Sequence, residues 1–220
     1  MPLPFVFPAS EGPGRLTEIA SFKKAPVDSS RLQNVITSAM QATSTFPAFR
    51  QCRLGDSVTD NGNTVLIFDW TSAVEKKEFE EDPNNASLKS AMASWAEIID
   101  EKNPSMIRYH ITLLGSSVTP QCGYYEVAVL TIDPSQHEVF AASMEKYSNG
   151  IGDKVFNYLA VAVSDENPEK LVIIMGYPNT ASAEHADKSD QHKEAKKVND
   201  PLVKDWWKSG SHMEQVFKRA

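Results

Sequence analysis

The sequence predicts an α+β protein made of two ferredoxin-like repeats, each a βαββαβ unit, packed sheet to sheet within one chain. Three observations lead to this prediction. Segments about 107 positions apart share a pattern of strand, turn and strand, and the same order of elements surrounds that pattern in both halves. Residues 171–175 are apolar at every position, which is typical of a strand with both faces covered.

The duplication is clearest in two pairs of strands. Residues 49–54 correspond to residues 156–161 at a shift of 107 positions. Without a gap, the same shift places residues 64–70 on residues 171–177. The sequence therefore predicts the same two strands, in the same register, in each half.

Two further stretches agree with this shift. Residues 60–63 and 167–170 combine Asn with Gly or Pro, as tight turns do. Residues 105–110 correspond to residues 212–217, which predicts the last strand of the second repeat near the C-terminus.

Each repeat is expected to begin with a strand, at about residues 16–24 and 123–132. Glu18 and Glu126 occupy the same place in these strands, at a shift of 108 positions. A helix follows in each repeat, because apolar residues recur there at helical spacing. Those residues are Leu32, Val35, Ile36, Ala39 and Met40 in the first repeat, and Val139, Phe140, Met144 and Tyr147 in the second.

After the hairpin, a second helical region presents one apolar face in the first repeat. Its members are Leu88, Ala91, Met92, Trp95 and Ile99. We expect an N-terminal arm at residues 1–14, the first repeat at residues 15–116 and the second at residues 122–220. Because the chain then carries both halves of a fused dimer, it is expected to be a monomer.

Composition narrows the classes of partner. The net charge is −7 and basic residues form no dense cluster, which argues against nucleic-acid binding. No apolar run is long enough to span a membrane, and the N-terminus lacks the basic start of a signal peptide. Cys52 and Cys122 have no metal-binding spacing, so we expect buried, reduced thiols in a cytoplasmic protein. Nucleotide-binding, hydrolase and zinc-protease motifs are absent from the sequence.

A local pattern in the second repeat carries a resemblance to a known family. Tyr177 ends a predicted strand, and His185 and His192 follow it, seven positions apart, in a predicted helix. Together with the topology of about residues 15–220, this pattern resembles the dimeric α+β barrel superfamily, and within it the antibiotic biosynthesis monooxygenases. The resemblance implies a single-chain, pseudo-dimeric α+β barrel.

The first repeat departs from that pattern. It keeps the aromatic residue as Trp70 but has Glu78 and Asn85 at the positions of the histidines. The haem-degrading branch of the family needs a ligand His with a particular Asn and Trp, a set that neither repeat completes. The resemblance therefore implies no cofactor.

The resemblance also implies a function. We expect a cofactor-independent enzyme of secondary metabolism that acts on a hydrophobic aromatic or polyketide-like small molecule, by oxygenation or by a cyclisation driven by proton transfer. The family also includes ligand-binding and stress-response proteins, so a non-catalytic binding protein is the alternative. The fold alone does not decide between them.

The paired carboxylates are the first candidate site residues. If Glu18 or Glu126 faces a covered side of the sheet, burial raises its pKa, and the group can act as an acid or base near neutral pH. The alternative is a strand-end glutamate that reaches solvent or pairs with a lysine.

The last strand of the first repeat offers another pair. Arg108 and His110 share one face of the strand, whereas Tyr109 lies on the other. If that face lines the space between sheet and helices, where the family has its pocket, His110 can move a proton and Arg108 can hold an oxyanion. A surface pair at a strand end is the alternative.

Aromatic residues could supply the pocket walls. Trp70, Trp95 and Tyr109 are the candidates in the first repeat, and Tyr177 with Glu126 in the second. The alternative is that these aromatic side chains belong to the core. Because only the first repeat combines Trp70 and Trp95 with Arg108 and His110, one pocket is expected to be active.

The second repeat also offers two histidines. His185 and His192 would share a helical face if the helix is unbroken. Their charged neighbours favour a solvated face instead, and without a third ligand no metal site is predicted.

Overall fold

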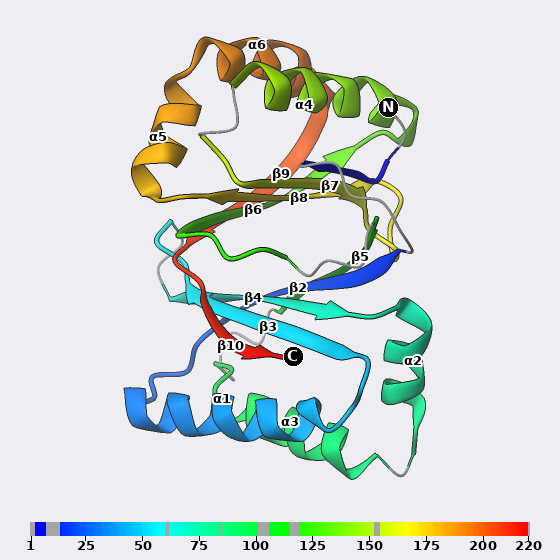
Figure 1. The fold of residues 1–220 in the computed structure, drawn as a ribbon, viewed down its shortest axis with the longest axis vertical. Coiled ribbons are helices and arrows are strands. Elements are labelled where there is room, and N and C mark those ends of the chain that lie inside the picture. Colours follow the sequence, from blue (N-terminus) through cyan, green and yellow to red (C-terminus); the bar gives the residue numbers. More distant parts are fainter. Residues whose placement is uncertain are drawn as a thin grey trace.

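Two antiparallel sheets lie face to face between two layers of helices (Figure 1). The computed structural model describes residues 3–7, 14–59, 62–83, 85–100, 106–114, 119–151 and 155–219. The predicted fold class, two ferredoxin-like repeats packed sheet to sheet, is confirmed.

Each sheet has five strands. The strand order of the first sheet is β10-β3-β4-β2-β5, and that of the second is β1-β7-β8-β6-β9. The strands of the first sheet are β2 (Arg15–Lys23), β3 (Phe49–Asp56), β4 (Asn63–Trp70), β5 (Ile107–Leu113) and β10 (Glu214–Lys218). The strands of the second sheet are β1 (Phe5–Phe7), β6 (Tyr124–Ile132), β7 (Tyr158–Val163), β8 (Lys170–Tyr177) and β9 (Val203–Ser211). Below, repeat one denotes β2 to β5 and repeat two denotes β6 to β9.

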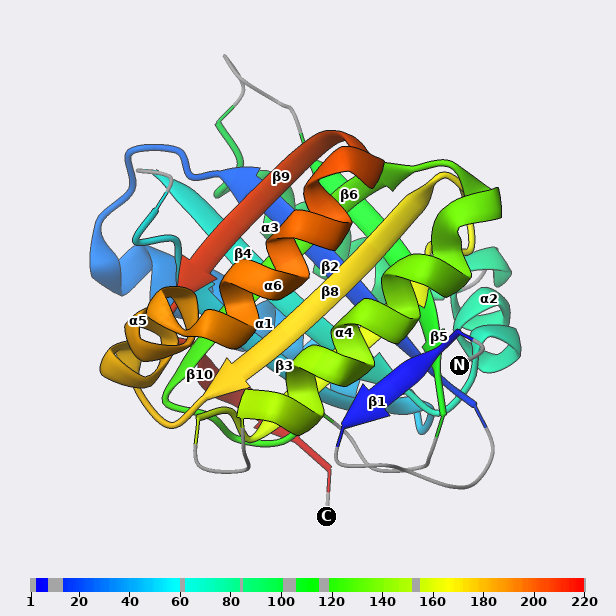
Figure 2. The ribbon, with the colours of Figure 1, turned by 90° about the horizontal axis from the view of Figure 1, so that it is seen from above.

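Helices cover the outer face of each sheet. Those of repeat one are α1 (Ser29–Ser44), α2 (Ala73–Glu81) and α3 (Ala86–Ala96). Those of repeat two are α4 (His137–Ile151), α5 (Thr180–Lys188) and α6 (Asp190–Asn199), with short 3-10 helices at Pro134–Gln136 and Asp200–Leu202. Seen from above, α4 and α6 lie over the second sheet, one on either side of β8 (Figure 2). Within the described residues no helix is long and apolar enough to cross a membrane.

The predicted shift of 107 positions holds through the hairpin and the helix that follows it. Leu54 lies opposite Leu66 in repeat one, and Val161 lies opposite Ile173 in repeat two. The bounds of α2 and α5 differ by the same 107 positions. The duplication is therefore exact over these elements.

The predicted match of residues 105–110 with residues 212–217 is wrong. Glu18 lies opposite His110 on β5, whereas Glu126 lies opposite Gly210 on β9. Ten residues separate α3 from β5, but only three separate α6 from β9, so the register changes between them. The C-terminal β10 instead pairs with β3 of the first sheet.

The described part of the predicted N-terminal arm also joins a sheet. Phe5–Phe7 forms β1 and pairs antiparallel with β7 of repeat two. Residues 1–2 and 8–13 of the predicted arm lie outside the described residues. Both ends of the chain thus contribute a strand to the sheet of the more distant repeat.

The second helical region is divided in both repeats. In repeat one α2 ends before Pro83, because a proline disfavours helical geometry at the residue that precedes it. In repeat two Ser189 ends α5, and its hydroxyl accepts the backbone N–H of His192 as the cap of α6. His185 and His192 therefore lie on separate helices and share no helical face.

A buried apolar core joins the two sheets. Val172 and Ile174 of β8 point into this core, whereas Leu171 and Ile173 pack against the helices of repeat two. The prediction of a strand covered on both faces is confirmed. Isolated bridges between Ile111 and Ser164 and between Ser57 and Ser211 link the two sheets.

Polar groups are also buried between the sheets. The Asp69 carboxylate accepts hydrogen bonds from the Thr17 hydroxyl at 2.7 Å and the Gln51 amide at 2.7 Å. It also accepts from the backbone N–H of Thr119, at 2.8 Å, in the connection between the repeats. Asp69 is fully buried, so these donors replace the water that it would otherwise bind.

We predict that Asp69→Asn lowers the free energy of unfolding by about 3 kcal/mol, because an amide brings donors to a site that needs an acceptor. Urea unfolding measures this loss. Asp205→Asn on the exposed surface of β9 is the control and should change stability by less than about 0.5 kcal/mol. Equal stability of the two variants would contradict the role of Asp69.

Candidate functional site

Repeat one contains a cavity of about 290 Å³ between its sheet and helices α2 and α3. A cavity of this volume is close to the lower end of the range for small-molecule sites. Most of its lining is apolar or aromatic, and the aromatic side chains are Phe22, Phe68, Trp70, Phe79 and Trp95. The cavity therefore suits a flat, hydrophobic molecule.

The walls come from strands whose alternate residues face the helices. Glu18, Ala20 and Phe22 line the cavity from β2, and Leu66, Phe68 and Trp70 line it from β4. Trp70 is buried, and among the described residues its indole N–H has no hydrogen-bond partner.

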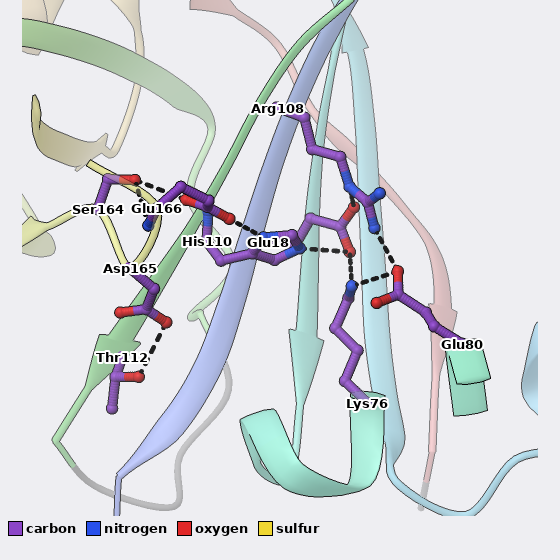
Figure 3. Close-up of polar contacts among 9 residues, drawn as sticks. All are labelled: Glu18, Lys76, Glu80, Arg108, His110, Thr112, Ser164, Asp165 and Glu166. Atoms are coloured by element: carbon purple, nitrogen blue, oxygen red, sulfur yellow. Dashed lines mark hydrogen bonds and ion pairs between the residues drawn. The ribbon is translucent and has the colours of Figure 1, made fainter. Parts of the chain in front are cut away.

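A group of charged side chains lies at one end of the cavity. We refer to Glu18, Lys76, Glu80 and Arg108 as the Glu18 cluster. Glu18 Oε1 accepts from Arg108 Nε at 2.5 Å, and Glu18 Oε2 lies 3.6 Å from Lys76 Nζ. Glu80 Oε1 bridges the two cations, at 2.6 Å from Lys76 Nζ and 2.6 Å from an Arg108 terminal nitrogen (Figure 3).

Lys76 is an unusual component of this cluster because it is only 3% exposed. Its ammonium lies 5.7 Å from the centre of the Trp70 ring, within the range of a cation–π contact. Both Lys76 and Trp70 line the cavity. The cavity end therefore presents buried positive charge next to an aromatic wall.

His110 lies behind Glu18 and links the cluster to repeat two. Its Nε2 is 3.7 Å from Glu18 Oε2, and its Nδ1 contacts Glu166 Oε1 (Figure 3). Burial lowers the pKa of His110, but the carboxylates of Glu18 and Glu166 raise it more, so its pKa is above the ordinary value. His110 is not among the residues that line the cavity.

The alternative for Glu18, a carboxylate that pairs with a lysine, is the one observed, and the pKa of Glu18 is not raised. Burial alone would raise it, but His110, Lys76 and Arg108 outweigh burial and lower the pKa of Glu18 to about 2. Glu18 is therefore ionised at neutral pH and is a weak base. Its position in the cavity, facing the helices, agrees with the prediction.

The other predicted residues are divided between the cavity and the core. Trp70, Trp95 and Arg108 line the cavity as predicted. The prediction for Tyr109 is wrong, because the strand alternation turns its side chain toward the core between the sheets. Tyr109 therefore does not contribute a cavity wall.

In repeat two the corresponding space is filled by side chains. Tyr177 occupies the position of Trp70, is 1% exposed and donates its hydroxyl to Glu126 Oε2 at 3.3 Å. Its ring packs against Phe156, which in turn packs against Tyr147. The predicted substrate-binding pair Tyr177 and Glu126 thus lies in a packed core.

The charged groups also differ between the repeats. Lys208 takes the place of Arg108, and its Nζ lies 2.8 Å from Glu126 Oε1. Gly210 takes the place of His110, and a Cβ at this position would lie 1.8 Å from the Tyr124 hydroxyl. Tyrosine packing therefore occupies the place that the imidazole has in repeat one.

Sequence reasoning missed Lys76, Glu80 and Glu166. Lys76 and Glu80 are four positions apart on α2, a spacing that indicates a helical ion pair but gives no sign of burial. Glu166 comes from the turn between β7 and β8, and no sequence pattern predicts that it reaches His110. Cys52 and Cys122 are buried free thiols, as predicted.

We predict that Glu18→Gln lowers the free energy of unfolding by about 3 kcal/mol at pH 6 and by about half as much at pH 3. The pKa of Glu18 falls from 4.5 to about 2 on folding, so its contribution is present above pH 4.5 and is lost as the pH falls through about 2. Urea unfolding at both pH values measures the difference. Glu78→Gln, on the exposed side of α2, is the control. A loss that is independent of pH would contradict the charge assignment.

Comparisons with known proteins agree with the fold. No protein-family model and no curated protein matches the sequence. A candidate monooxygenase from Fusobacterium nucleatum has a TM-score of 0.70 at 8% identity, covering 94% of this chain and 99% of that chain. An anthrone oxidase-like protein has a TM-score of 0.67 at 10% identity and covers 98% of both chains. A candidate chlorite dismutase has a TM-score of 0.65 at 10% identity, covering 93% of this chain and 96% of that chain.

With these neighbours and its two stacked sheets, the chain has the fold of the dimeric α+β barrel superfamily, in a form that carries both repeats in one chain.

Proposed function

We propose that the cavity of repeat one binds a hydrophobic aromatic small molecule and that the chain oxygenates this molecule without a bound cofactor. The main support is an aromatic-walled cavity with Lys76 and Arg108 at one end. The chain also shares its fold with proteins named for monooxygenase and anthrone oxidase activity.

The chemistry that suits this cavity is oxidation of an activated methylene group. Transfer of a proton to solvent water gives a carbanion whose charge spreads onto a neighbouring oxygen, and nearby cations stabilise that charge. The proton returns in the water that forms when O₂ is reduced. The anion then reduces O₂, so that R₂CH₂ and O₂ become R₂C=O and H₂O. Both oxygen atoms are accounted for, and no further reductant is needed.

The Glu18 cluster would supply the electrostatic part of this reaction. Lys76 and Arg108 would lower the pKa of the ligand and hold the developing oxyanion. Glu18, which is already ionised, would hold the two cations in place.

A non-catalytic binding protein is the second candidate. It is favoured by the low pKa of Glu18, which leaves this carboxylate a weak base at neutral pH. A cyclisation driven by proton transfer needs an acid and a base in the cavity. Because Glu18 is a weak base, cyclisation is less well supported than oxygenation.

We predict that anthrone, used as a probe, quenches the tryptophan fluorescence of the protein and is consumed together with an equal amount of O₂. An oxygen electrode and mass analysis of the product measure the reaction. Ala91→Phe should weaken binding at least about tenfold, because Ala91 is buried in the cavity wall and a phenyl ring would fill the space.

Val198→Phe is the matched control, since Val198 is exposed on α6, lies 107 positions after Ala91 and lines a separate groove between α4 and α6. Binding without oxygen consumption would select the non-catalytic function. If Ala91→Phe and Val198→Phe bind anthrone equally well, the cavity is not the binding site.

A further inference from the structure

We propose that Glu166 of repeat two is a positioning residue of the repeat-one cavity: it holds the His110 imidazole charged behind Glu18, so that the cavity selects aromatic ligands with a negatively charged oxygen. The inference rests on the proposed function, because it concerns the same cavity. It adds to the proposed function a class of ligand, and it assigns a role at this cavity to a residue of repeat two.

The contacts of Glu166 fix the orientation of the imidazole. One carboxylate oxygen contacts His110 Nδ1, and the other accepts the backbone N–H of His110 at 3.1 Å. The Ser164 hydroxyl donates to that second oxygen at 2.6 Å, which holds the carboxylate in place. The ring then directs Nε2 toward Glu18 Oε2 at 3.7 Å, and within the described residues Nε2 has no hydrogen-bond partner.

The turn that carries Glu166 is docked independently of this side chain. The backbone N–H of Asp165 donates to the carbonyl of His110 at 2.8 Å, and Ile111 forms a bridge with Ser164. Thr112 also donates its hydroxyl to Asp165 at 3.2 Å. A change of Glu166 alone should therefore leave the turn in position.

Repeat one docks on repeat two through the corresponding contact, but with uncharged groups. Ser57 is bridged to Ser211, and the Thr59 hydroxyl accepts the backbone N–H of Gly210 at 3.0 Å. Thr59 lies 107 positions before Glu166, and Gly210 lies 100 positions after His110. The contact of Thr59 with Gly210 thus holds the two repeats together without charged groups. We infer that the Glu166–His110 pair is not required for packing and is available for another role.

Charge balance gives the expected ligand. The charged and titratable groups that face His110 from β2, α2, the β7–β8 turn and its own strand are Glu18, Lys76, Asp165, Glu166 and Arg108. Glu18, Glu80 and Glu166 are three carboxylates, and they balance Lys76, Arg108 and a protonated His110. Loss of the His110 proton leaves one negative charge in excess behind the cavity end and weakens the binding of an anion.

Two fluorescent probes that share a ring system test this inference. Anilinonaphthalene sulfonate carries a permanent negative charge, and N-phenylnaphthylamine lacks it. We expect the Kd of the sulfonate to rise about tenfold as the pH rises through the pKa of His110, because one unit charge is lost near the site. The Kd of the neutral probe should stay constant.

Variants connect the effect to the named residues. His110→Gln should abolish the pH dependence for the sulfonate, and Glu166→Gln should move its midpoint to lower pH, since the imidazole loses one carboxylate partner. Glu169→Gln, in the same turn but paired with Lys204, is the control and should leave the midpoint unchanged. An NMR titration of the His110 ring without probe should show the same shift for Glu166→Gln.

The outcomes separate the two proposals. If the neutral probe binds and Ala91→Phe displaces it, but the sulfonate shows no pH dependence, the present inference is wrong and the proposed binding function stands. An unchanged His110 titration in Glu166→Gln would also overturn the inference. If neither probe binds in the cavity, the proposed function itself fails.

Discussion

The packing of one sheet on the other is the constraint on which the rest of the structure depends. Helices cover only one face of each sheet, so the other apolar face has to be covered by the second sheet. Ile19 and Val65 of the first sheet share one buried cluster with Val127 and Ile174 of the second. This stacking brings the β7–β8 turn against β5, and with it Glu166 against His110. A residue of repeat two thus enters the site of repeat one because the core requires both sheets.

The same scaffold holds a cavity in one half and a packed core in the other. The difference comes from a few substitutions at equivalent positions. Tyr177 has a hydroxyl that Trp70 lacks, and this hydroxyl reaches Glu126 inside repeat two. Gly210 leaves room for Tyr124, where an imidazole would collide with it. In repeat two, tyrosine side chains therefore pack where repeat one has an indole and an imidazole.

Local patterns in the sequence were sufficient to predict the fold, because strand register and helix faces depend on neighbouring residues. Leu171 and Val172 show this, since unbroken apolar character predicted burial on both faces. The last strand was misplaced because the connections before β5 and β9 differ in length. The sequence could not decide the direction of the Glu18 pKa shift, because Lys76 comes from a helix beyond the hairpin and the burial of Lys76 has no local signature. Glu166 lies 56 positions from His110, and only the stacking of the sheets joins them.

In repeat one, the residues that the proposed function uses have features that cost stability. Burying Glu18 costs solvation energy, which Lys76 offsets only together with His110 and Arg108. The Trp70 indole N–H, which has no hydrogen-bond partner among the described residues, and an open apolar cavity add to this cost. Repeat two has the buried Tyr177 at the position of Trp70 and surrounds Glu126 with tyrosines and a single lysine. Because both repeats share the core between the sheets, the compact packing of repeat two can support the less stable arrangement in repeat one. If stability alone were selected, side chains would fill the space between sheet and helices in both repeats. Selection for ligand binding is therefore the simpler physical explanation of the open cavity in repeat one.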